Sequence, residues 1–105
     1  MADIMNMLRQ AQQVQGRLQE LQQELENMTV TASSGGGMVT VTADGKGQVR
    51  AVRIDPTVVN PADVEMLEDL VVAAVAEAQK KAAELAQDEM KKLTGGLGLP
   101  FKLPF

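Results

Sequence analysis

The stretch from Met28 to Ile54 constrains the fold more than any other part of this sequence. It holds three short runs rich in Val and Thr, at about residues 28–34, 38–43 and 47–54, and glycine-containing segments separate the runs. β-branched residues favour extended backbone, and short glycine-rich connections favour hairpin turns. The stretch therefore predicts a three-stranded antiparallel meander. Asp55-Pro56 predicts the end of the third strand, because proline has no N–H to donate to a sheet.

The segment before the meander predicts one long helix over about residues 4–27. Its apolar residues recur at alternating steps of three and four, which is the heptad spacing of a packing seam. A helix of this length is about 36 Å long. So narrow an apolar stripe needs a facing helix, from this chain or from a second copy. The seam consists of Ile4, Met7, Ala11, Val14, Leu18, Leu21 and Leu25.

A second long helix is predicted over about residues 61–94. Asn60 is the expected N-cap, Pro61 the first helical residue, and Gly95-Gly96 the stop signal. The apolar face of this helix is strong as far as Ala78 and thinner beyond it. We therefore expect the first half to pack on the sheet and the second half to form a more exposed arm.

The last segment, residues 95–105, is an apolar tail rich in Gly and Pro. Such a composition does not favour regular secondary structure. Two interpretations follow from it. The tail is either disordered, or it is a docking strip that places Phe101 and Phe105 in a groove on a neighbouring molecule.

The predicted strands carry apolar residues on both faces of the sheet. Strict alternation puts Val49 and Ala51 on one face of the third strand, and Val52 and Ile54 on the other. An antiparallel sheet with one face in water normally has one polar face. We therefore expect one face to pack on the chain's own helices, and the other face or an edge to meet a second subunit. The candidate packing residues of the sheet are Val39, Val41, Val52 and Ile54.

Composition limits the chemistry that this chain can perform. Its 105 residues include no His, Cys, Trp or Tyr, which removes the commonest general base and the thiolate nucleophile. Gly45-Lys46-Gly47 does not fit the phosphate-binding loop pattern, which requires Gly-Lys-Ser/Thr. We expect a protein that is not an enzyme and that has no cofactor and no metal site. No apolar run approaches 18 residues and nothing resembles a signal peptide, so we expect a cytoplasmic protein without membrane contact.

The charged residues give opposed indications about a nucleic-acid partner. The formal net charge is −4 and the pI is about 4.7, which argues against a nucleic-acid partner. However, two lysine pairs lie eleven residues apart, at 80–81 and 91–92, on the same side of the second predicted helix, as phosphate contacts would require. Acidic residues lie on that side too, so a solvated face of ion pairs is the alternative. Arg9 and Arg17 are roughly cofacial on the first predicted helix.

Five segments, in order along the chain, resemble the YbaB/EbfC family of bacterial nucleoid-associated proteins. They are residues 6–15, 37–42, 54–56, 66–71 and 101–105. The resemblance implies an α+β protomer: a long helix, a three-stranded antiparallel meander and a second long helix, in a single domain over residues 1–94. It also implies a tweezer-like homodimer, in which paired sheets form the base and the helices form the arms.

The same resemblance implies the function. The homodimer would bind double-stranded DNA with little or modest sequence preference, alter its conformation, organise the nucleoid in the cytoplasm and influence gene expression. Because acids interleave with the basic residues, we expect weak, salt-sensitive binding. The alternative is a protein-interaction module that serves replication, repair or recombination factors. Carried onto this chain, the candidate DNA-binding residues are Arg9, Arg17, Lys80, Lys81, Lys91 and Lys92.

Overall fold

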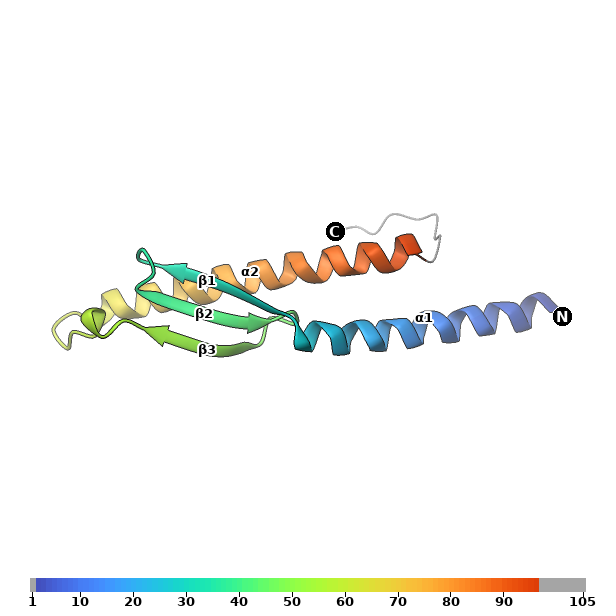
Figure 1. Cartoon of the computed structure of the whole chain (residues 1–105), viewed down its shortest axis with the longest axis horizontal. Helices are drawn as coiled ribbons and strands as arrows, with labels where there is room; N and C mark the ends of the chain where they lie inside the picture. Colours follow the sequence, from blue (N-terminus) through green and yellow to red (C-terminus); the bar gives the residue numbers. More distant parts are fainter. Residues whose placement is uncertain (1, 97–105) are drawn as a thin grey trace.

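The glycine-punctuated stretch forms a three-stranded antiparallel sheet between two long helices (Figure 1). The computed structural model describes residues 2–96, so the predicted tail interaction of Phe101 and Phe105 lies outside the described residues. The predicted α+β order of helix, meander and helix is confirmed. The elements are α1 (Ala2–Asn27), β1 (Thr29–Ser34), β2 (Val39–Asp44), β3 (Val49–Ile54), a 3₁₀ turn η1 (Pro56–Val58) and α2 (Val64–Gly96).

The strands follow one another in space as β1-β2-β3. A bulge interrupts the pairing of β2 with β3: Thr42 pairs with Ala51, but the next residue, Ala43, pairs with Val49. Arg50 is therefore the extra residue, and it resets the alternation of the third strand. The expectation that Val49 lies on the face opposite Val52 and Ile54 was wrong, because strict alternation assumes an unbroken register.

With this register, one face of the sheet is apolar and the other is polar. The apolar face packs on α2 through a cluster of fully or almost fully buried residues, which are Ala32, Val39, Val41, Ala43, Ala74 and Ala78. The open face carries the hydroxyl residues Thr29, Thr31, Ser33, Thr40 and Thr42. Strict alternation predicted apolar residues on both faces of the sheet. In the structure, apolar residues alternate with polar residues along the strands, as expected for an antiparallel sheet with one solvated side.

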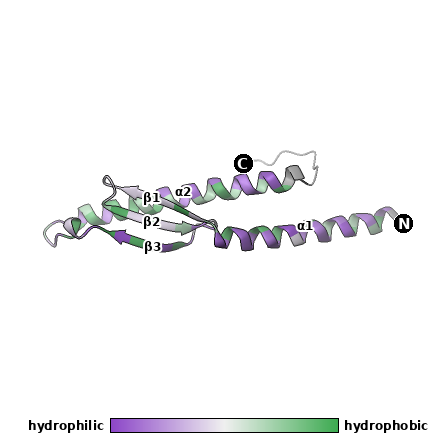
Figure 2. Ribbon diagram, in the orientation of Figure 1, coloured by the Kyte–Doolittle hydropathy of each residue, from purple (hydrophilic) through white to green (hydrophobic). Residues whose placement is uncertain are grey.

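Small residues let α2 lie close to the sheet. Ala74, Ala78 and Ala82 are spaced four apart and have no exposed surface, so they form one stripe along the helix. Figure 2 shows that hydrophobic residues gather in the first half of α2, whereas α1 is mostly hydrophilic. The first half of α2 therefore packs on the sheet, as its apolar face predicted.

The start of α2 differs from the prediction. The helix begins at Val64, and Asp63 caps it, because the Met66 N–H donates to Asp63 Oδ1 at 3.2 Å. Asn60 instead closes a turn: its Oδ1 accepts from the Ala62 N–H at 3.0 Å, and its carbonyl accepts from the Asp63 N–H at 2.9 Å. Both residues are good caps by type, and the turn at Asn60 delays the helix.

Helix α1 joins the sheet at its C-terminal end only. The Gly45 N–H, in the turn after β2, donates to the carbonyl oxygens of Leu25 at 2.8 Å and Met28 at 3.1 Å. Leu21 and Leu25 are buried there, whereas Ile4 and Met7, at the other end of the predicted seam, are 63% and 67% exposed. The molecule measures 73 × 22 × 17 Å, and α1 extends past the end of the sheet (Figure 1).

Candidate nucleic-acid interface

The predicted basic residues of α2 have unequal surroundings. Lys81 Nζ donates to the Thr31 carbonyl oxygen of β1 at 2.9 Å, so this side chain ties the helix to the sheet. Lys92 Nζ forms an exposed ion pair with Glu89 Oε1 at 3.2 Å, one turn earlier on the same helix. Lys80 and Lys91 are exposed. Exposed pairs of this kind are weak and open readily, so Lys92 remains accessible to an anionic partner.

The two arginines of α1 lie in different surroundings. Arg17 lines a polar pocket of about 290 Å³ between α1 and α2, together with Lys92 and the acids Glu20, Glu24 and Glu89. The structure thus brings Arg17 and Lys92 together, but among three carboxylates. Arg9 lies eight residues further from the sheet, which is about 12 Å along the helix, and it is exposed.

The strands carry basic residues that are not among the candidates predicted from the sequence. Between residues 29 and 54 basic residues outnumber acidic residues, whereas acidic residues outnumber basic residues on each helix. Arg53 pairs with Thr40 across the strands, which places it on the open hydroxyl face. Strict alternation already put Arg53 on the face opposite Val52 and Ile54, but it did not show that this face is open.

Arg50 acts with Asp44, a buried acid. The Arg50 guanidinium approaches Asp44 Oδ2 at 2.8 Å, and Asp44 Oδ1 accepts from the backbone N–H groups of Lys46 at 2.9 Å and Gln48 at 3.0 Å. Burial by itself raises the pKa of the Asp44 carboxyl, but these hydrogen bonds and the guanidinium charge outweigh it and lower the pKa below its ordinary value. Asp44 therefore organises the turn between β2 and β3. Lys46 in turn pairs with Glu26 of α1 at 2.9 Å.

The described residues show neither a candidate metal site nor a candidate membrane span. Residues 2–96 contain no group of three or more Asp, Glu, His or Cys side chains that could hold a metal ion. No helix in that part of the chain is long and apolar enough to cross a membrane. The exposed cations on the two helices and on the open sheet face are thus the features that suit an anionic partner.

Comparisons with known proteins point to the same class of partner. The model of the YbaB/EbfC DNA-binding family matches residues 1–97. The chain is 55% identical to a nucleoid-associated protein of Gemmatimonas aurantiaca, over 98% of this chain and 99% of that protein. It is 50% identical to a nucleoid-associated protein of Gluconacetobacter diazotrophicus, over 100% and 98%. The crystal structure of an uncharacterized protein from Helicobacter pylori has a TM-score of 0.69 at 21% identity, over 87% and 91%, and supports the fold alone.

Proposed function

Because this chain belongs to the YbaB/EbfC DNA-binding family, we propose that it binds double-stranded DNA as a homodimer, with little or modest sequence preference. The bound dimer alters DNA conformation, organises the nucleoid in the cytoplasm and influences gene expression. The family is a DNA-binding family and not an enzyme family. The family match over residues 1–97 is the observation that carries this proposal.

The geometry supports a contact through the helices. Helix α1 and the C-terminal part of α2 extend past the same end of the sheet, so each protomer presents a pair of arms (Figure 1). Arg9 and Arg17 lie on α1 and Lys91 and Lys92 on the part of α2 beyond the sheet, whereas Lys80 and Lys81 lie where α2 is still beside the sheet. Basic side chains spaced along a rod suit the repeating phosphates of a duplex. The proposed contacts are Arg9, Arg17, Lys80, Lys81, Lys91 and Lys92.

Two features support the dimer. Strand β3 is at the edge of the sheet, all six of its residues are exposed, and its apolar side chains Val49, Val52 and Ile54 are 39–43% exposed. An edge strand with an apolar face is a template for pairing with another chain. The exposed N-terminal half of the α1 seam, which includes Ile4 and Met7, also needs a partner surface.

Electrostatics sets the expected strength of binding. Exposed charges act within about a Debye length, roughly 8–10 Å, so a basic arm can bind phosphate although the whole chain has a net charge of −4. Acids beside Arg17 and Lys92 offset part of that attraction. We therefore expect few net phosphate contacts and weak binding that falls as the salt concentration rises.

The test is a fluorescence-anisotropy titration of a labelled duplex over a range of salt concentrations. Lys80→Glu should weaken binding and lower the slope of log affinity against log salt by about 2 for a dimer, which loses one phosphate contact on each protomer. Arg53→Glu is the matched control, because it makes the same charge change on the sheet face. Equal losses in the two variants would contradict a contact through the helices, and affinity that does not change with salt would contradict the electrostatic model.

The excess of acids on both helices and the exposed apolar seam favour a second candidate, a protein-interaction module for replication, repair or recombination factors. The two candidates differ in a simple observation. A wild-type dimer that shows no DNA binding at low salt would support the second candidate. Binding at low salt that Lys80→Glu weakens supports the first.

A further inference from the structure

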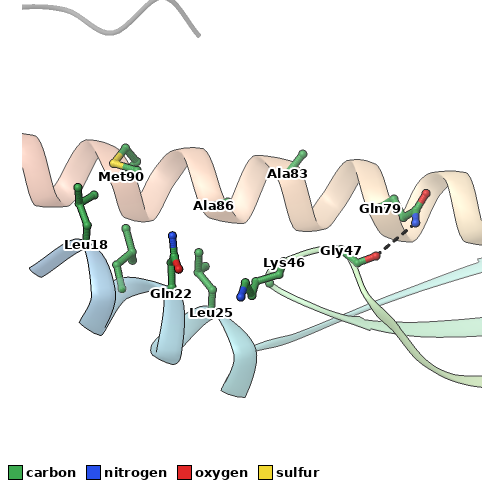
Figure 3. Close-up of a pocket in the computed structure, with 11 residues that line it drawn as sticks. Leu18, Gln22, Leu25, Lys46, Gly47, Gln79, Ala83, Ala86 and Met90 are labelled. Carbon is green, nitrogen blue, oxygen red and sulfur yellow. Dashed lines mark hydrogen bonds between the residues drawn. The ribbon is translucent and has the colours of Figure 1, made fainter. Parts of the chain in front are cut away.

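A groove separates α1 from α2 next to the turn between β2 and β3 (Figure 3). Its volume is about 480 Å³, and its lining is mainly apolar. Leu18 and Leu25 point from α1 toward α2, while Ala86 and Met90 lie on the α2 side (Figure 3). Leu18, Ala86 and Met90 remain partly exposed in the described chain. Apolar side chains that face each other across an open space indicate a site that something else fills.

The size of the groove limits its occupant. A few side chains from an extended segment can occupy 480 Å³. An extended apolar segment therefore suits the groove, and a helix of a second copy is the alternative that the test must separate from it.

The chain itself has such a segment directly after α2. In residues 97–105 every odd position is Leu or Phe, and every even position is Gly, Pro or Lys. In an extended backbone alternate side chains lie on the same side, so all five apolar side chains share one face. Each proline also favours extended backbone in the residue before it, which here applies to Leu99 and Leu103.

The segment also starts in the right place. Helix α2 ends at Gly96, six residues or about 9 Å beyond Met90 in the wall of the groove. Nine extended residues reach about 30 Å, which is more than the distance from Gly96 back to Met90. Lys102 is the only charged side chain of the segment. The neighbouring polar pocket holds three acids and two bases, so its charge is complementary to Lys102.

We infer that residues 97–105 dock in extended form in the groove of their own chain, with the apolar side chains between α1 and α2. The docked segment would fasten α1 to α2 over the length where the two helices face each other. This role goes beyond the binding of DNA and does not depend on it.

The composition of the chain provides a direct test. Phe101 and Phe105 are its only aromatic residues, so in an NMR spectrum of the full chain every contact between aromatic and methyl protons reports on this segment. We expect nuclear Overhauser effects from the phenyl rings to methyl groups of Leu18, Leu25 and Met90. Absent effects, or effects to Val49, Val52 or Ile54 on β3 instead, would overturn the inference.

Two further measurements separate the groove from other sites. Ala86→Gln fills the groove and should abolish the contacts, whereas Ala73→Gln, at an exposed position of α2 outside the groove, should keep them. Contacts that persist in both variants would exclude the groove. In a sample that mixes ¹³C-labelled and unlabelled chains, contacts within one chain support the inference, and contacts only between chains overturn it in favour of exchange between two copies.

Discussion

At the scale of single residues, Asp44 shows how one buried acid determines a turn. Its carboxylate accepts hydrogen bonds from two backbone N–H groups and from the Arg50 guanidinium, and the side chain has no exposed surface. Nothing in the sequence distinguishes it from any other Asp before a Gly-rich turn. A residue type predicts a turn, but it does not predict burial or an arginine six positions later.

The first prediction concerns the pH dependence of stability. The folded-state pKa of Asp44 is below the ordinary value of 3.8, so the folded state releases this proton more readily than the unfolded state does. The stabilisation is therefore complete above that value and is lost as the pH falls through the folded-state pKa. Asp44→Asn should lower the free energy of unfolding at neutral pH, and its difference from wild type should shrink below about pH 4.

Chemical denaturation of both proteins between pH 7 and pH 2.5 measures this difference. Asp55 also has a lowered pKa, because the backbone N–H and the hydroxyl of Thr57 donate to it. Asp55→Asn should therefore also show a difference that depends on pH, whereas Asp88→Asn, with the same change of charge at an exposed position of α2, is the control. A constant difference between wild type and Asp44→Asn over the whole pH range would contradict the assignment to Asp44.

At the scale of elements, Gly16 in the middle of α1 is a weak point of the helix. A Cβ atom built on Gly16 meets nothing within 4 Å. Glycine in a helix interior costs roughly 0.5–1 kcal/mol relative to alanine. Gly16→Ala should therefore raise the free energy of unfolding by about that amount and slow hydrogen exchange in α1.

Gly36→Ala should have the opposite effect on the free energy of unfolding. A Cβ atom at Gly36 also meets nothing within 4 Å, but the backbone φ is +69°. An L-residue is strained in that region, so this variant should be less stable than wild type. If Gly16→Ala is as destabilising as Gly36→Ala, then Gly16 has a role in α1 that the open space around it does not reveal.

The elements themselves were largely predictable. The strands lie within two residues of the predicted bounds, because β-branched runs and glycine turns are strong local signals. The bulge at Arg50 was not predictable, because the sequence fits a regular strand equally well. The start of α2 was not predictable, because Asn60 and Asp63 are both suitable caps by residue type. The tie from Lys81 to Thr31 spans fifty residues, so helix spacing alone could not reveal it. The predicted site residues themselves remain a proposal.

At the scale of the whole molecule, the exposed apolar face of β3 leads to a prediction about assembly. If the dimer forms through this face, Val52→Lys should give a monomer, because a charged side chain would enter the apolar contact. Ala51→Lys, on the open face of the same strand, should remain a dimer. Size-exclusion chromatography with light scattering measures the mass of each variant. A Val52→Lys dimer, or a monomer only in Ala51→Lys, would contradict a contact through the apolar face.

The attachment of α1 has a mechanical consequence. A helix of 26 residues is about 39 Å long, and it is held at one end, where the Gly45 N–H meets the Leu25 carbonyl oxygen. A Cβ atom on Gly45 would lie 2.7 Å from that oxygen, so only glycine allows this joint. Within residues 2–96, the helix is thus held at its C-terminal end only. A tilt of about 10° at its root would displace the far tip by roughly 7 Å, which is about the distance between adjacent phosphates along a DNA strand.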